Sequence, residues 1–275
     1  MDMLERLAEV AKERKTILCF GVDPDHERIK KAISVGTEIE DTLGPFFHAI
    51  IERLLEENAI AALKPNYAYF AQYGFDGLFV LEDIIQRYKG NVPIIFDGKR
   101  GDIGRSSEAY AREVYDFWGA DAVTISPYMG EDSVKPFVRE GKLAYMLCRT
   151  SNSGAKDFEE LIAGGAKGGD GGKHVYECVA AKALEWKTGL VVGATSDAIK
   201  KLAAETKNQV PFLIPGVGAQ GGDLEMVMDA IKANPAIHRI NASSSIAYAF
   251  EKGGKPEDAA LKEAEKLNAV IRKHF

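Results

Sequence analysis

The chain has 275 residues, 46% of them hydrophobic, and a formal net charge of −6, so it is long enough for one α/β barrel or two smaller domains. The acidic balance excludes a global basic field for nucleic acid, and no apolar run approaches the roughly 18 residues of a membrane span. The cysteines, Cys19, Cys148 and Cys178, are too scattered for a disulfide framework or a zinc site. Because Met1–Arg6 lacks the apolar stretch of a signal peptide, we expect a soluble, cytoplasmic protein.

Short β-rich runs alternate with longer helical patterns along the chain. In chain order, the predicted strands are Thr16–Asp23, Ala59–Asn66, Val92–Lys99, Ala122–Pro127, Leu143–Thr150, Leu190–Thr195, Phe212–Val217 and Arg239–Ser243. The predicted helices are Asp41–Glu56, Gly74–Tyr88, Ser106–Trp118, Asp132–Glu140, Val175–Trp186, Asp197–Lys207, Asp223–Ala233 and Pro256–Lys273, with Ser106 and Ser196 as helix-start residues.

This alternation predicts a single (β/α)8 TIM barrel that occupies residues 1–275 as one domain. Several of the strands are near-continuous apolar runs, as expected for strands that are buried on both faces. The one long irregular segment is the glycine-rich Ser151–Lys173, which is interpreted as a surface connection, with a mobile lid as the alternative.

Charged residues interrupt the third predicted strand. The apolar run Ile94–Phe96 is followed by Asp97, Lys99 and Asp102, and Lys64 ends an earlier apolar run in the same manner. Asp97 and Lys99 are two residues apart, so in an extended chain their side chains point the same way. Because an alternating charge cluster is costly to desolvate, we expect it to serve chemistry rather than stability. A lysine held among carboxylates stays protonated and can act as a positioned acid.

Other strand ends also carry polar residues, where barrel enzymes place their working groups. These are Asp23, Ser126, Thr150–Ser151 and the segment Gly216–Gly222. Glycines between a strand and a helix let backbone N–H groups approach an anion, although an ordinary tight turn has the same composition. Taken singly, Asp23 could be a turn residue and Asp102 a helix N-cap. The five histidines show no metal-ligand spacing.

These motifs resemble a known family. The pattern Asp97-x-Lys99-x-x-Asp102, with Lys64 upstream and Pro215–Gly222 downstream, resembles orotidine 5′-phosphate decarboxylase. The runs that resemble its longer bacterial and archaeal subgroup (type 2) are Phe96–Ser107, Pro127–Ser133 and Leu147–Asn152. The resemblance implies decarboxylation of orotidine 5′-monophosphate to uridine 5′-monophosphate without a metal or an organic cofactor.

The same resemblance implies roles for individual residues. Lys99 would donate a proton to C6 of the pyrimidine, Asp97 would lie against the substrate carboxylate, and Lys64 would fix the charge network and contact ribose hydroxyls. Asp102 would reach into the neighbouring subunit's site, which implies a homodimer with shared active sites.

Substrate-binding roles are implied for a second group. Asp23 would bind the ribose, and Ser106 would lie near the partner's ribose. Ser151 would contact the pyrimidine, Gln220 would contact the phosphate, and Gly218 lies in the same phosphate-binding loop.

One position departs from the family pattern. After the eighth strand the family carries an arginine that binds the phosphate, and Ser244 occupies that place here. Serine supplies a hydrogen bond but no charge, so binding is expected to weaken unless another cation substitutes. Arg239 is near in sequence, but we expect it to begin the strand.

Two alternatives stay open at this point. A sugar-phosphate decarboxylase or hexulose-phosphate synthase shares the Asp-x-Lys-x-x-Asp motif, but those enzymes use magnesium and tend to carry an acidic residue where this chain has Lys64. A nucleotide-binding protein without catalysis would fit the loss of the arginine. The retained Asp97 and Lys99 argue against it, because an unused buried charge cluster is costly.

Overall fold

The computed structural model describes residues 2–31, 36, 38–164, 172–217 and 222–275. All eight predicted strands are present in one parallel sheet. Their bounds are β1 Leu18–Val22, β2 Ala62–Pro65, β3 Ile95–Arg100, β4 Ala122–Ile125, β5 Leu143–Arg149, β8 Gly189–Val192, β9 Phe212–Ile214 and β10 Arg239–Ala242.

The sheet closes on itself. Its hydrogen-bonded order is β2-β1-β10-β9-β8-β5-β4-β3, which leaves β2 and β3 at the two ends. Parallel bridges join Leu63 to Ile94 and Asn66 to Asp97, so these two strands also meet. The predicted (β/α)8 barrel is therefore confirmed.

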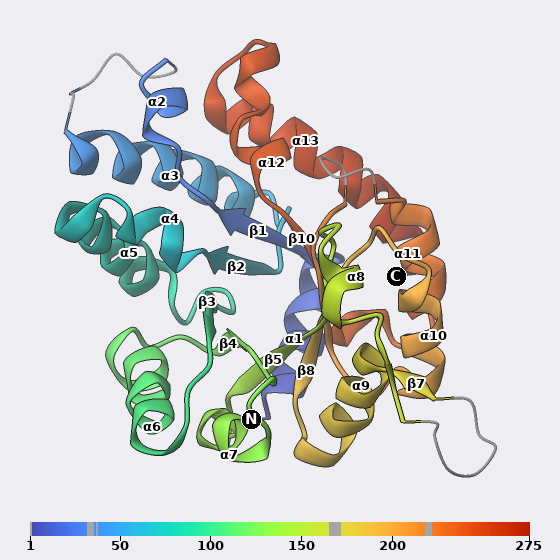
Figure 1. Ribbon diagram of the computed structural model, residues 1–275. Helices are drawn as coiled ribbons and strands as arrows, with labels where there is room; N and C mark the ends of the chain where they lie inside the picture. Colours follow the sequence, from blue (N-terminus) through green and yellow to red (C-terminus); the bar gives the residue numbers. More distant parts are fainter. Residues whose placement is uncertain (1, 32–35, 37, 165–171, 218–221) are drawn as a thin grey trace.

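Helices surround the strands, as Figure 1 shows. The α-helices are α1 Met3–Arg14, α2 His26–Ile29, α3 Ile39–Glu56, α4 Tyr67–Ala71, α5 Gly74–Tyr88, α6 Gly104–Arg112, α7 Glu131–Val134, α8 Ala155–Phe158, α9 Val175–Trp186, α10 Ala198–Glu205, α11 Leu224–Ile231, α12 Ser244–Ala247 and α13 Pro256–Ile271. One π-helical turn, η1 Glu113–Phe117, continues α6, and the 3₁₀ turns are η2 Lys135–Phe137, η3 Pro235–Ile237, η4 Ala249–Lys252 and η5 Arg272–His274.

Apolar residues pack in two layers. One layer lies between the strands and the surrounding helices, where Phe47 and Ile50 of α3 are fully buried. The other fills the barrel itself, where Cys19, Ala62 and other strand residues pack against Leu7 of α1. Helix α1, which was not predicted, closes the N-terminal end of the barrel. The end of the barrel that is open to a ligand is therefore the opposite one, at the C-terminal ends of the strands.

Three fully buried polar residues connect the elements at the closed end of the barrel by hydrogen bonds. Arg239, the first residue of β10, donates hydrogen bonds to backbone carbonyls that include those of Leu7 and Ala61, at 2.7 and 3.3 Å. Thr16 donates to the side chain of Asn268 in α13 at 2.6 Å, and Asn268 donates to the carbonyl of Ala59 at 2.9 Å. The expectation that Arg239 begins the strand is confirmed, and it lies far from the C-terminal strand ends.

Two predicted helices need correction. Helix α6 begins at Gly104, so Ser106 lies inside its first turn rather than at its start. The helix predicted over Asp132–Glu140 is much shorter, because α7 passes into the 3₁₀ turn η2. Pro136, in that turn, lacks the N–H group that a continuing α-helix needs.

Candidate active site

A pocket of about 700 Å³ opens at the C-terminal ends of the strands. All eight strands contribute a residue to its wall, from within the strand or from the position just past its end; these are Asp23, Lys64, Asp97, Thr124, Thr150, Val191, Leu213 and Asn241. Barrel enzymes bind their substrates at this end, and the volume is within the usual range for small-molecule sites.

Asp97 lies at the centre of a charge network. Its Oδ2 accepts a hydrogen bond from Lys64 Nζ at 2.7 Å, and its Oδ1 accepts one from Lys99 Nζ at 2.7 Å. The Thr124 hydroxyl also donates to Oδ1, at 2.7 Å. Asp97 is 7% exposed and Lys64 4%, whereas the Lys99 side chain is 51% exposed and faces the pocket. The network thus offers one free ammonium face to a ligand.

Burial and charge act in opposite directions on these groups. Burial alone would raise the pKa of Asp97, but the ammonium groups of Lys64 and Lys99 outweigh it and hold that pKa well below its usual range. Burial alone would lower the pKa of Lys64, but Asp97 and Asp23 outweigh it and raise that pKa. Asp97 is therefore a carboxylate and Lys64 an ammonium at neutral pH.

The Lys99 side chain reaches Asp97 from a left-handed backbone conformation rather than from the extended strand that was predicted. Lys99 has a φ of +44°, in the left-handed region, and the register of β3 against β4 shifts between Phe96 and Arg100. The extended-chain reasoning for this pair was therefore wrong, although the two side chains do meet. Left-handed backbone at a residue other than glycine costs about 1–3 kcal/mol and is concentrated at functional sites. Thr124 supports it, because its Oγ1 accepts a hydrogen bond from Lys99 N at 3.0 Å.

Two buried acceptor oxygens in the pocket have no hydrogen-bond partner among the described residues. They are Oδ1 of Asp23 and Oδ1 of Asn241. Such atoms are costly to leave unsatisfied, so they are suited to accept hydrogen bonds from hydroxyl groups of a ligand. Asn241 was not predicted as a site residue, although a polar residue near the C-terminal end of a predicted strand was a usable signal.

The remaining predicted residues divide into three groups. Ser151 and Ser244 line the pocket. Asp102 is half-buried and Ser106 is exposed, and neither lines the pocket of its own chain. Of the two carboxylates in the predicted charge cluster, Asp97 and Asp102, only Asp97 therefore lies beside the lysines in the pocket. The third group, Gln220 and Gly218, lies outside the described residues; the adjoining Gly216 and Val217 line the pocket.

The segment Ser151–Lys173 is less irregular than predicted. It contains helix α8, and β6 Ile162–Ala163 pairs in antiparallel fashion with β7 Lys173–His174. Residues 165–171 lie outside the described part. The lid interpretation stays a prediction.

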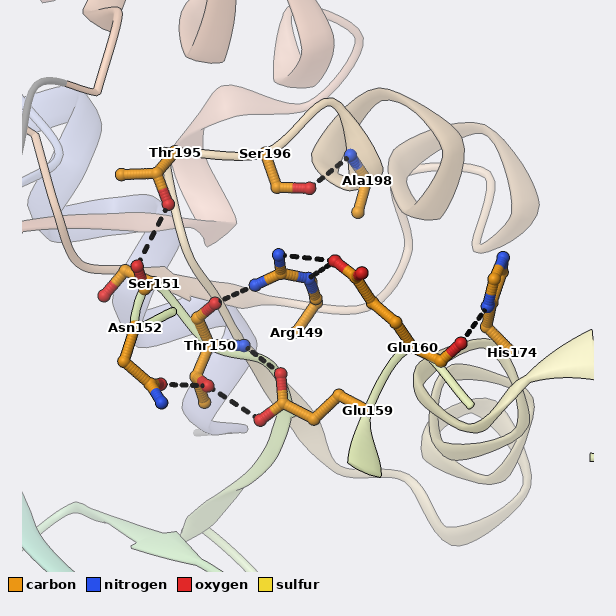
Figure 2. Close-up of polar contacts among 10 residues, drawn as sticks. All are labelled: Arg149, Thr150, Ser151, Asn152, Glu159, Glu160, His174, Thr195, Ser196 and Ala198. Carbon is orange, nitrogen blue, oxygen red and sulfur yellow. Dashed lines mark hydrogen bonds and ion pairs between the residues drawn. The ribbon is translucent and has the colours of Figure 1, made fainter. Parts of the chain in front are cut away.

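Figure 2 shows how the beginning of this segment is attached to the end of β5. Arg149 donates from Nε and Nη2 to Glu160 Oε1 at 3.1 and 2.7 Å. Thr150 N donates to Glu159 Oε2 at 2.8 Å. The backbone carbonyl of Glu160 lies 2.6 Å from His174 Nδ1, which brings in the start of α9. These contacts fix the pocket wall on both sides of Ser151.

Ser151 is also held from the neighbouring strand end. Thr195 donates to its carbonyl at 3.3 Å, as Figure 2 shows. Gly193 is close enough that an added Cβ would lie 2.7 Å from Ser151 N. Ser196, predicted to start a helix, accepts a hydrogen bond from Ala198 N at 3.1 Å, but the N-cap residue of α10 is Asp197, one residue later.

The part of the chain that the structure describes holds neither a metal-binding cluster nor a membrane-spanning helix. No group of three or more His, Cys, Asp or Glu side chains there is arranged to hold a metal ion. No helix there is both long and apolar enough to cross a membrane.

A closed parallel barrel with a charged pocket at its C-terminal end places the protein among the (β/α)8-barrel enzymes. More narrowly, residues 16–255 match the family model of the orotidine 5′-phosphate decarboxylase / HUMPS family, and the chain belongs to this family. The family resemblance is thereby confirmed.

Individual relatives agree with the family match. The orotidine 5′-phosphate decarboxylase of Herpetosiphon aurantiacus is 37% identical over 95% of each chain. That of Ralstonia pickettii is 39% identical over 90% of each chain. Among solved structures, the UMP synthase of Leishmania donovani is 34% identical with a TM-score of 0.82, covering 98% of this chain and 57% of that one.

Proposed function

We propose that the protein decarboxylates orotidine 5′-monophosphate to uridine 5′-monophosphate in pyrimidine biosynthesis. The observation that carries the proposal is Asp97, buried between Lys64 and Lys99 at the base of a pocket, in a chain of this family. We propose further that residues 1–275 act as one catalytic domain in the cytoplasm. The three free cysteines are in keeping with a reducing compartment.

The chemistry follows from the charge network. When the bond from C6 to the carboxylate breaks, CO2 leaves and the electron pair stays on C6. The ammonium of Lys99 stabilises that charge and then donates its proton to C6. Asp97 would repel the substrate carboxylate in the ground state, and Lys64 holds Asp97 in place. Fixed ammonium groups supply the positive charge, so the proposal requires neither a metal nor an organic cofactor.

The substrate is bound along the pocket wall. Asp23, with its unpartnered Oδ1, would accept hydrogen bonds from the ribose hydroxyls. Ser151 would contact the pyrimidine. Gln220, Gly218 and Ser244 would lie at the phosphate. Binding of the distant phosphate holds the reactive end of the molecule against Lys99.

We also propose a homodimer with shared active sites, in which Asp102 and Ser106 act in the partner's site. Large apolar side chains are exposed on α4, on α5, at the start of and within α6, and in the loop between β4 and α7, with Phe75 77% and Tyr128 86% exposed. Others in this set are Tyr69, Phe79, Ile103, Tyr110 and Met129. Exposed large apolar side chains in this number support a protein interface on these elements.

The first test follows the ultraviolet absorbance of orotidine 5′-monophosphate mixed with the protein, with and without EDTA. Loss of substrate absorbance that resists EDTA and is absent in the Lys99→Ala variant is the expected result. If turnover is abolished by EDTA, or if the protein instead turns over sugar phosphates in the presence of magnesium, the sugar-phosphate decarboxylase or hexulose-phosphate synthase alternative would replace the proposal. Binding of uridine 5′-monophosphate without turnover would point to a binding protein.

Shared sites are tested by mixing inactive variants. Lys99→Ala and Asp102→Asn are each expected to be inactive. After subunit exchange, a mixed dimer carries one intact site, so about a quarter of all sites should regain activity if exchange is random. No recovery in mixed dimers whose formation is shown by mass spectrometry would mean that Asp102 acts within its own chain.

A further inference from the structure

The cations of the pocket are unevenly distributed. Among the described residues, those that line the pocket are Lys64, Lys99 and Arg28. Both lysines are bound to Asp97 at the base. Arg28 is not part of that network; it lies on α2 after β1 and contacts Tyr248 and Glu251, which follow β10. The pocket therefore offers positive charge to a ligand from two separate groups of residues.

Arg28 is held rigidly. Its Nε and Nη2 donate to the two carboxylate oxygens of Glu251 at 2.8 and 2.7 Å, and its guanidinium carbon lies 3.7 Å from the centre of the Tyr248 ring. The Tyr248 hydroxyl in turn donates to the carbonyl of Asp23 at 2.9 Å and accepts from Asp25 N at 2.7 Å. A planar guanidinium that is stacked and paired in this way loses little entropy when it binds an anion.

One part of the guanidinium remains available. The hydrogen bonds of the Arg28 side chain to described residues come from Nε and Nη2, which leaves Nη1 without such a partner. The side chain is one-third exposed and lines the pocket. The Tyr248 beneath it follows one turn after Ser244, since Tyr248 N donates to the Ser244 carbonyl at 3.1 Å. Arg28 and Ser244 both line the pocket, and the residue against which Arg28 stacks is one helical turn from Ser244.

We propose that Arg28 binds the phosphate of the nucleotide and supplies the positive charge that Ser244 lacks. This inference rests on the proposed function, because it takes the ligand to be a nucleoside monophosphate. A phosphate carries about −1.5 to −2 charges at pH 7, which matches a guanidinium better than a hydroxyl. Glu251 is a positioning residue, because it binds Nε and Nη2 and leaves Nη1 available to the phosphate.

The test compares a phosphorylated ligand with its nucleoside in the Arg28→Gln variant. We expect the KM for orotidine 5′-monophosphate and the inhibition constant of uridine 5′-monophosphate to rise by about 10- to 100-fold. The kcat should change far less, and the much weaker inhibition by uridine should not change. Arg28→Lys, which keeps the charge, should fall between the wild type and Arg28→Gln.

A matched control is Arg87→Gln. Arg87 also pairs with a glutamate, Glu52, at 2.6 Å, but it does not line the pocket, so all of these constants should remain as in the wild type. Unchanged affinity of Arg28→Gln for uridine 5′-monophosphate would overturn the inference. Equal weakening for uridine would overturn it as well, since Arg28 would then only shape the wall.

The two proposals fail separately. If the wild type does not decarboxylate the substrate, the proposed function fails, while calorimetric binding of uridine 5′-monophosphate and uridine still tests Arg28. If the wild type is active and Arg28→Gln discriminates between the two ligands as the wild type does, only the assignment of Arg28 fails.

Discussion

Replacing Thr124 by valine tests how the charge network is supported. Thr124 is fully buried, and valine keeps its shape while removing the hydroxyl that donates to Asp97 and accepts from Lys99 N. A hydrogen bond to a charged group contributes about 1.5–3 kcal/mol, and leaving the partly buried N–H of Lys99 without a partner adds roughly 1 kcal/mol. We therefore expect the free energy of unfolding to fall by about 3 kcal/mol. Because the backbone of Lys99 loses its support, kcat should fall by about 10- to 100-fold.

Urea unfolding at pH 7.5 measures the first effect, and the absorbance assay measures the second. Thr124→Ser is the matched control, because it keeps the hydroxyl and loses only a methyl group, at a cost of about 1 kcal/mol. If the valine variant is as stable and active as the wild type, or if serine is as damaging as valine, the hydroxyl does not support Asp97 and Lys99 as described.

Three further predictions concern other parts of the structure. Gly193→Ala should raise KM, because the added Cβ would lie 2.7 Å from Ser151 N and displace it; unchanged kinetics would contradict this. Ser244→Arg should lower KM for the substrate by roughly tenfold, since it adds a cation at the phosphate; an unchanged or raised KM would count against it. Burial lowers the pKa of His238 to about 3, so unfolding takes up a proton below the unfolded value of about 6.5 and stability falls as the pH drops from there toward 3. In urea unfolding at pH 5, the His238→Asn variant should have lost about 2 kcal/mol less of its free energy of unfolding than the wild type, each relative to its own value at neutral pH. An equal loss in the variant and the wild type would refute the prediction.

The strands could be predicted because most are apolar runs buried on both faces, and their spacing alone indicated a barrel. Helix α1 was missed, although Met3, Leu7 and Ala11 share one face and are buried. The left-handed backbone of Lys99 could not be predicted, since lysine gives no local signal for it. Thr124 has the sequence context of an ordinary strand residue, and its contacts with Asp97 and Lys99 arise only because β4 pairs with β3 in the fold.

Residues whose role depends on long-range contacts could not be predicted from the sequence. Arg28 meets Tyr248 and Glu251 only because β1 pairs with β10, more than two hundred residues later in the chain. Its sequence context is that of an ordinary charged residue after a strand. Lys64 and Asp97 were predictable because each ends an apolar run, where parallel strands deliver side chains to one place.

The pairing of β1 with β10 also has a consequence for biosynthesis. The barrel cannot close on the ribosome until β10 has left the exit tunnel, and the buried contacts of Arg239 and Asn268 at the closed end come with that late segment. Until then β1 has an open edge, of the kind that invites pairing with other chains. Nascent chains that stall before β10 are therefore expected to be the form that most needs chaperones.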